Sequence, residues 1–260
     1  DKHVLHGNVE QFFGIIPPAA RFMAVVKSNA YGHGLVLTAK LLSDFWQKKK
    51  PLRELWFGVD SITEALRLRR EGISVPILVL GYTLPSRIAE AAEHNIALTI
   101  SQFENLKIIT ALKNRPSIHI KIDTGMHRQG FFPAEAPTLI AFLKKYQIRP
   151  EGIFTHFAAA KDSAAPAYTL RQFAAFIKVV GQFEEAGYSG LIRHAAASGA
   201  ALLFPETHLD MVRVGMAMYG SWPSREAEWS EAAERISLKP VLAWKTIIGE
   251  VKIIPFGAFV

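Results

Sequence analysis

Cysteine is absent from this chain of 260 residues. A chain without cysteine has no disulfide framework, no thiolate metal site and no cysteine nucleophile. Long apolar runs are also absent, since no uninterrupted apolar stretch approaches the roughly 20 residues that cross a bilayer. Residues 1–20 lack the basic region and apolar stretch of a secretory signal. We therefore expect a cytoplasmic protein without a membrane partner, and we assign no metal ligands.

The charge is basic but not concentrated. The formal net charge is +7, yet the basic residues are scattered except for Lys48, Lys49 and Lys50, which Arg53 follows. So short a run is typical of a solvated helix end or loop, and we predict no nucleic-acid partner. With 50% hydrophobic and 20% charged residues, the composition is that of a folded globular protein. The length permits a single large α/β barrel domain.

Short apolar or β-branched runs recur along the chain. Most are followed by a longer amphipathic stretch, which is the rhythm of βα units. Eight candidate strands, the number in a closed barrel, lie at residues 22–26, 55–59, 76–80, 96–100, 117–122, 152–156, 191–195 and 209–214. The predicted fold class is therefore α/β, a (β/α)8 barrel of the TIM type.

The intervening helices have their own start signals. Residues 61–64 and 101–104 both combine a serine with a glutamate three positions later, the pattern of a capping box. A helix over about 166–186 is predicted to cover a strand with an apolar stripe made of Leu170, Phe173, Phe176, Ile177, Val180 and Phe183.

The pattern changes after about residue 235. Residues 238–256 are rich in valine, isoleucine and tryptophan with partial alternation, and no helix follows them. We expect a barrel over 1–235 and the beginning of a β-rich domain over 236–260, which these residues are too few to complete.

Lys27 follows the first candidate strand, at the end of a barrel strand where barrel enzymes keep their sites. A lysine in this place is by itself more often a solvated surface group. Its neighbours change that interpretation, because residues 27–34, KSNAYGHG, closely resemble the cofactor-lysine signature of the alanine racemases. The resemblance continues in order through 120–131, 155–162, 194–205 and 212–220. The chain is thus similar to the N-terminal barrel of this family, whose members are pyridoxal-phosphate enzymes of fold type III.

The resemblance implies pyridoxal 5'-phosphate as the cofactor, carried by Lys27 as a Schiff base. Lysine is the only side chain whose amine forms an imine with the pyridoxal aldehyde, and transimination then delivers the substrate to the same carbon. The resemblance also implies that Lys27 removes or returns the α-proton on one face of the adduct. It makes Lys27, Arg128 and His156 the catalytic set, with the His156 ring packed against the pyridine rather than carrying a proton.

A second block, Lys121 to Arg128, is similar to the family's lysine–aspartate–threonine–glycine–methionine–x–arginine block. Strand alternation predicts that Lys121 and Asp123 share one face. An inward lysine is costly unless it is paired, so Lys121 should be neutralised or modified. In many family members the matching lysine is carbamylated and orients the arginine, which here is Arg128. The resemblance assigns Arg128 to the phenolic oxygen of the cofactor and the substrate carboxylate; a surface arginine is the alternative.

The remaining cofactor contacts follow from the same resemblance. Ser198 is expected near a helix start, where it could equally be a plain N-cap. Ala197 stands where the family usually has asparagine, so one polar contact is expected to be lost. Arg213 is assigned to the pyridine nitrogen, which keeps that nitrogen unprotonated and favours racemisation over transamination. The phosphate is assigned to the Tyr31 hydroxyl, Ser198 and the backbone amides of Gly215 and Met216.

The resemblance implies interconversion of L- and D-alanine by two-base proton exchange in a homodimer, supplying D-alanine for peptidoglycan. In the family, the second base is a tyrosine in the β-domain of the partner subunit, and no residue here matches its motif. We therefore expect these 260 residues by themselves to bind cofactor but to racemise poorly. Two alternatives stay open: a serine or broad-specificity racemase, and a non-catalytic pyridoxal-phosphate-binding barrel.

Overall fold

The computed structural model describes residues 1–161 and 166–258. Residues 162–165 and 259–260 lie outside the described part, and with them the end of the 155–162 block and the end of the predicted 236–260 domain.

Eight parallel strands form one sheet in the order β7-β6-β5-β4-β3-β2-β1-β8. Two hydrogen bonds join its ends, from Arg213 N to Ala196 O (3.1 Å) and from Asp210 N to Arg193 O (3.0 Å), so the barrel is nearly closed. The predicted eight-stranded α/β barrel is confirmed. The strands β1 to β8 span Arg21–Val25, Leu55–Val59, Ile77–Val79, Ala97–Ile100, Ile118–Lys121, Gly152–Phe154, Ile192–His194 and Met211–Val214.

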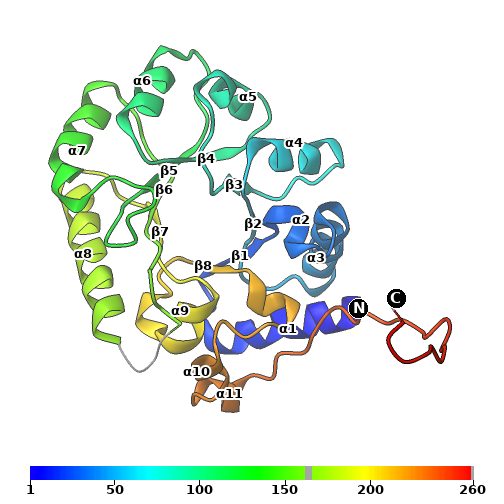
Figure 1. Ribbon diagram of the computed structural model, residues 1–260. Coiled ribbons are helices and arrows are strands. Elements are labelled where there is room, and N and C mark those ends of the chain that lie inside the picture. Colours follow the sequence, from blue (N-terminus) through cyan, green and yellow to red (C-terminus); the bar gives the residue numbers. More distant parts are fainter. Residues whose placement is uncertain (162–165, 259–260) are drawn as a thin grey trace.

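Helices surround the strands (Figure 1). The α-helices α1 to α11 span Lys2–Ile15, Lys27–Tyr31, Leu35–Lys49, Ile62–Arg70, Ile88–Glu93, Phe103–Ala111, Ala136–Lys145, Pro166–Glu185, Ser198–Leu203, Arg225–Glu228 and Ala232–Arg235. Four 3-10 helices, η1 to η4, span Pro85–Arg87, Pro133–Glu135, Pro205–Thr207 and Met216–Tyr219. A large apolar core lies between the strands and the helices.

The barrel interior holds both apolar and polar side chains. Side chains of β1 to β4 and of β7 and β8, including Met23, Trp56 and Ile192, form a small buried apolar cluster. Successive side chains of a strand point to opposite faces, so the even-numbered isoleucines of β5 join the outer core while His119 and Lys121 lie inside the barrel.

The two predicted capping boxes have different outcomes. The Ser61 hydroxyl accepts from Glu64 N (3.3 Å) and caps α4 as predicted. The box at 101–104 is wrong, because the N-cap of α6 is Gln102 and no side chain caps this helix. Phe103, the first residue of α6, packs against Phe131 with ring centroids 5.0 Å apart. This tertiary contact sets the helix start and overrides the local signal.

The helix predicted over 166–186 is observed as α8, but its apolar stripe is rotated. Phe176, Val180 and Phe183 are buried as expected. Leu170 and Ile177 are instead 40% and 38% exposed, and Thr169 and Gln172 take buried positions. The Gln172 side chain accepts from Ala158 N (3.1 Å), so a hydrogen bond to the β6 loop holds a polar residue on the inner face.

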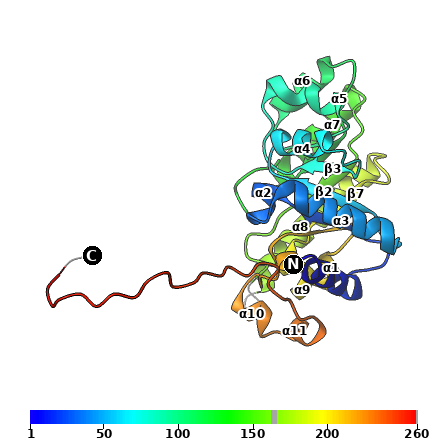
Figure 2. The same cartoon turned by 90° about the vertical axis from the view of Figure 1, so that its right-hand side faces the viewer.

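The described residues from 236 to 258 contain no strand. Figure 2 shows this segment running away from the barrel as an extended trace. A strand needs a hydrogen-bonding partner, and no β-pairing among the described residues involves this segment. Ile236 and Leu238 are buried against the barrel, whereas the later apolar side chains, including Trp244, Ile253 and Phe256, are exposed. The assignment of 236–260 to a second domain stays a prediction. In the part described here, no helix combines the length and apolar character needed to cross a membrane.

Candidate active site

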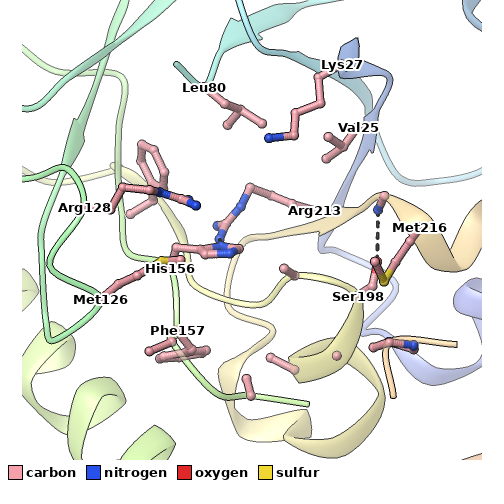
Figure 3. A pocket seen from close by; sticks show the side chains of 18 of the residues that line it. Val25, Lys27, Leu80, Met126, Arg128, His156, Phe157, Ser198, Arg213 and Met216 are labelled. Carbon is pink, nitrogen blue, oxygen red and sulfur yellow. Dashed lines mark hydrogen bonds between the residues drawn. The ribbon is translucent and has the colours of Figure 1, made fainter. Parts of the chain in front are cut away.

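A cavity of about 530 Å³ opens at the carboxyl ends of the strands, the end at which α/β barrels carry their sites. Side chains from widely separated parts of the chain converge on it (Figure 3). All nine residues predicted from the sequence line this cavity: Lys27, Tyr31, Lys121, Arg128, His156, Ser198, Arg213, Gly215 and Met216.

Lys27 begins a turn of unusual handedness directly after β1. The next four residues, 28–31, all have φ between +52° and +55°, which is a left-handed helical turn of non-glycine residues. Such a conformation costs about 1–2 kcal/mol per residue and persists only where surrounding contacts impose it. Here Asn29 N donates to Glu64 Oε1 (3.2 Å) and the Asn29 Oδ1 accepts from Leu35 N (2.9 Å). The turn lets both Lys27 and Tyr31 line the cavity.

The Lys27 amine forms an ion pair with Asp60, which follows β2. Lys27 Nζ lies 3.4 Å from Asp60 Oδ1, and both side chains are partly exposed to the cavity and solvent. Figure 3 shows the lysine directed into the space between Arg128 and Arg213. The amine is therefore accessible to a ligand and held by a single weak ion pair.

Tyr31 lies against the backbone of Gly215. A Cβ on residue 215 would lie 2.5 Å from the Tyr31 hydroxyl oxygen, so glycine leaves the space that the phenol occupies. Burial, with a smaller contribution from Asp60, raises the pKa of Tyr31. The phenol therefore keeps its proton at neutral pH and can donate a hydrogen bond to an anion.

Ser198 joins the loop after β7 to the loop after β8. It is the first residue of α9, whose N-cap is Ala197, so the plain N-cap alternative is wrong. Its hydroxyl accepts from Gly215 N (3.0 Å). The first hydrogen bond of α9 is donated by Ala201 N, so the amides of residues 198–200 have no partner within the helix. Hydroxyl groups and backbone amides thus gather where barrels commonly bind phosphate, at the loops after strands seven and eight.

Lys121 is buried at the end of β5, with 5% of its surface exposed. Its Nζ donates to Gln129 Oε1 (3.3 Å). Burial, followed by the positive charges of Arg128 and Arg213, lowers the pKa of Lys121 to about 8. About a tenth of this amine is therefore uncharged at about pH 7, far more than for an ordinary lysine.

Because β5 ends at Lys121, Asp123 lies outside the strand, and the face shared by Lys121 and Asp123 stays a prediction. Asp123 lies in the following loop, and its Oδ1 accepts from the amides of Gly125 (2.9 Å), Met126 (3.0 Å) and His127 (3.0 Å). Burial opposes ionisation of Asp123, but these three backbone bonds prevail and lower its pKa. Asp123 therefore shapes the loop that carries Arg128 and does not pair with Lys121.

Arg213 is buried among uncharged partners. Its Nη2 donates to Thr155 O (2.9 Å) and Ala195 O (2.9 Å), and its Nη1 lies 2.9 Å from His194 Nδ1. Arg213 takes part in no salt bridge with a carboxylate among the described residues. Burial lowers its pKa to about 9, so the guanidinium stays charged at neutral pH.

His156 lies two residues beyond the end of β6, beside Arg213 and near Arg128 (Figure 3). Its Nδ1 is 3.2 Å from Arg213 Nη2 and must accept, since a guanidinium only donates. Burial and the surrounding cations, Arg213 first, lower the pKa of His156 to about 3. The ring is therefore neutral at physiological pH, in agreement with a packing role.

Three neighbours of the predicted site residues carry no prediction from sequence. Asp60 contacts Lys27, Gln129 accepts from Lys121, and His194 accepts from Arg213. His194 opens one of the family-like blocks, and an inward position on the seventh strand would have indicated it. Asp60 and Gln129 lie outside any local pattern that predicts such contacts. No group of three or more metal-ligating side chains occurs among residues 1–161 and 166–258.

The protein is thus a nearly closed α/β barrel that carries a lysine, two arginines and a helix start at the carboxyl ends of its strands, a set of groups that suits an anionic ligand. The family described as alanine racemase, N-terminal domain, matches residues 1–223. The chain therefore belongs to the alanine racemase family.

Relatives of known sequence agree. The chain is 38% identical over 258 residues to the alanine racemase of Desulforamulus reducens, covering 96% of this chain and 66% of that protein. It is 38% identical over 261 residues to the alanine racemase of Methanococcus maripaludis, covering 98% and 67%. The chain thus spans about two thirds of the length of these curated relatives.

Solved structures share the fold. Alanine racemase of Bacillus anthracis with bound L-Ala-P superposes with a TM-score of 0.82 at 33% identity, over 92% of this chain and 61% of that one. Alanine racemase of Clostridium difficile in complex with cycloserine gives a TM-score of 0.81 at 32% identity, over 92% and 64%.

Proposed function

We propose that this chain is the cofactor-binding barrel of a pyridoxal-phosphate-dependent amino-acid racemase that acts on alanine. The observation that carries the proposal is the convergence of Lys27, Arg213 and the Ser198 to Gly215 junction on one cavity of about 530 Å³. An amine, a buried cation and a set of anion-binding groups are what the aldehyde, the pyridine and the phosphate of this cofactor each require.

The described residues fit the cofactor by the chemistry of their donors. The Ser198 hydroxyl and the Gly215 amide already meet at 3.0 Å, and the Tyr31 hydroxyl contacts the same glycine. These groups, together with the Met216 amide, would hold the phosphate. The junction lies across the cavity from Lys27 and Arg128 in Figure 3, which leaves room for a ring between them.

Lys27 would bind the cofactor and act as one of two bases. When bound, pyridoxal phosphate supplies the aldehyde that captures an amino acid and a conjugated ring that withdraws electrons from its α-carbon. Lys27 Nζ would take the α-proton from one face of the substrate in one direction of the reaction and return a proton to that face in the other direction. Asp60, 3.4 Å away, keeps the free amine near that position.

Arg213 would determine the reaction type. A guanidinium with a pKa of about 9 keeps its proton at neutral pH and only donates, so a pyridine nitrogen facing it stays unprotonated. An unprotonated ring is a weaker electron sink and favours return of the proton to the α-carbon. The fixed neutral state of His156, beside Arg213, excludes it as a competing proton donor.

Arg128 would hold the carboxylate of the substrate and the phenolic oxygen of the cofactor, and a carbamylated Lys121 would orient it. An amine with a pKa of about 8 is partly free to react with carbon dioxide at neutral pH. In that reaction the nitrogen bonds to the carbon of CO2 and loses a proton to water, leaving a carbamate. The new negative charge would neutralise a buried cation and orient Arg128.

The full activity in this proposal needs a second base, a tyrosine from the β-domain of a partner subunit in a homodimer. The product, D-alanine, would be made in the cytoplasm and used in peptidoglycan. Two observations support alanine as the substrate: the related sequences are alanine racemases, and the related structures were solved with L-Ala-P or cycloserine bound. A serine or broad-specificity racemase of the same family is the alternative.

Borohydride reduction after mixing the protein with pyridoxal phosphate tests the proposal. Peptide mapping is expected to find the cofactor fixed on Lys27, and Lys27→Ala should abolish it. Lys40→Ala, which removes an exposed lysine on α3, is the matched control. Labelling of other lysines alone, or none in a folded sample, would overturn the proposal. Exchange of the α-proton in D2O, measured for alanine and serine, then separates the two substrates.

A further inference from the structure

Four polar side chains form a line through the interior of the barrel. Arg213 Nη1 lies 2.9 Å from His194 Nδ1. His194 Nε2 lies 2.9 Å from His119 Nδ1. His119 Nε2 lies 3.6 Å from Glu151 Oε2, within ion-pair distance. We call these four residues the axial relay.

The axial relay joins the two ends of the barrel. Both histidines are 0% exposed and Arg213 is 3% exposed, whereas the side chain of Glu151 is 36% exposed. Glu151 precedes β6 and lines a separate cavity of about 440 Å³ formed by the segments that lead into β3, β4 and β5. The relay therefore connects a solvent-accessible carboxylate to the buried cation of the active-site cavity.

The chemistry of the end groups determines the direction of every hydrogen bond. A guanidinium only donates, so His194 Nδ1 accepts, and the proton of a neutral His194 must sit on Nε2. That proton points at His119 Nδ1, which accepts in turn and places the His119 proton on Nε2. This last proton faces the carboxylate of Glu151 at 3.6 Å, an ion-pair distance beyond hydrogen-bond range, and His119 Nε2 has no hydrogen-bond partner among the described residues. Both rings are held in the same tautomer.

Charge supports the same direction. Burial is the main reason that the pKa values of His119 and His194 are lowered, and the nearby Arg213 adds to the effect. Arg21 also disfavours a charge on His119, while Glu151 favours one. The adjacent His119 ring holds the pKa of Glu151 below its usual value. The relay thus has a cation at one end, an anion at the other and two neutral rings between them.

The barrel is built around this line. His119 and Gly152 are paired in register, and a Cβ at residue 152 would collide with the His119 ring. Phe154 stacks on His194 with ring centroids 4.6 Å apart and an interplanar angle of 7°. Trp56 meets His119 edge to face at 5.5 Å. These contacts leave the two imidazoles little freedom to turn.

We propose that Glu151, at the opposite end of the barrel from the cavity, is a positioning residue for Arg213. Its negative charge lies beside His119 Nε2 and favours the proton on that nitrogen, which is the same tautomer that the donor Arg213 requires at the other end of the relay. Without the carboxylate, His119 can carry its proton on Nδ1 instead. The Nδ1–H of His119 would then face the Nε2–H of His194, and the repulsion would move the His194 ring away from the Arg213 guanidinium. The consequence for catalysis rests on the proposed function; the existence of the relay does not.

Nitrogen NMR of 15N-histidine-labelled, cofactor-free protein tests the relay directly. We expect His119 and His194 each to carry one proton, on Nε2, from about pH 5.5 to about pH 8. In Glu151→Ala, the ring signals of His194 should lose this single-tautomer pattern although residue 151 does not contact His194. Glu93→Ala, at the end of α5 and away from the relay, should leave them unchanged. A proton on Nδ1 in the wild type, or unaltered His194 signals in Glu151→Ala, would overturn the proposal.

A second measurement uses protein loaded with pyridoxal phosphate. Glu151→Ala is expected to change the pH dependence of the cofactor's absorption band, and Glu151→Gln, which keeps an acceptor but no charge, should restore it in part. Identical titrations for all three proteins would count against a link to Arg213. If the wild type forms no band at all, the proposed function fails while the NMR result on the relay still stands.

Discussion

The hydroxyl oxygen of Tyr31 lies 2.5 Å from the position that a Cβ on residue 215 would occupy. Gly215→Ala should therefore displace the phenol, because overpacking a filled space costs about 1–3 kcal/mol. We expect the Kd for pyridoxal phosphate to rise about tenfold or more, since 1.4 kcal/mol is a factor of about 10. Gly181→Ala is the control, because its Cβ would meet nothing within 4 Å. Equal affinities of the two variants would contradict a phosphate site here.

The second prediction concerns the charge on Lys121. Burial lowers its pKa from 10.5 to about 8, so between these values the unfolded chain binds a proton that the folded protein does not. The free energy of unfolding should therefore rise as the pH increases from about 8 to 10.5. Below about pH 8, the charged buried amine lowers the free energy of unfolding by about 3 kcal/mol. Lys121→Met should be more stable than the wild type at about pH 7 and should lack the rise.

Urea unfolding of cofactor-free protein in buffers depleted of carbon dioxide measures this difference. Lys40→Met removes an exposed lysine that pairs with Glu71 at 2.8 Å, and it should leave the pH dependence in this window unchanged. Stability curves of wild type and Lys121→Met that run parallel above about pH 8 would show that Lys121 is not a buried, deprotonating amine.

Much of the fold follows from local patterns. Most barrel strands, such as β2 and β3, are short runs of apolar and β-branched residues that are buried on both faces, and such runs are visible without a structure. The blocks that resemble a known family predict the cavity residues, and the barrel brings the ends of its strands together. Lys27, which follows β1, and Arg213 on β8 are far apart in sequence, yet β1 and β8 are neighbouring strands.

The features that local patterns did not predict depend on tertiary contacts. The left-handed turn of residues 28–31 contains no glycine and is imposed partly by Glu64 of α4. The start of α6 follows from the packing of Phe103 rather than from Ser101. Asp123 lies two residues beyond Lys121, the last residue of β5, and its carboxylate accepts hydrogen bonds from the loop amides instead of pairing with Lys121.

The third prediction concerns acid stability. Burial and nearby cations lower the pKa of His156 from 6.5 to about 3. Between these two pH values, His156 is protonated in the unfolded chain but not in the folded protein. Stability should therefore fall as the pH drops below about 6.5, by about 2 kcal/mol at about pH 5 from this residue alone. His156→Gln keeps an acceptor for Arg213 and should lose less stability on acidification. His3→Gln, on the exposed face of α1, is the control; an acid limb that is equally steep in all three proteins would contradict the assignment.

The last prediction concerns Gly152, whose missing side chain lets the His119 ring reach His194. Gly152→Ala places a methyl group in a fully buried strand where the colliding atoms belong to an imidazole that is hydrogen-bonded on one side and packed against Trp56 on the other. The ring cannot move aside without breaking the axial relay, so we expect a loss of about 1–3 kcal/mol in the free energy of unfolding. Urea denaturation measures this loss. Gly181→Ala in α8 adds the same methyl group in open space and should instead gain about 0.5–1 kcal/mol. If Gly152→Ala were as stable as the wild type, the His119 ring would have another position available, and the single path from Glu151 to Arg213 would be lost.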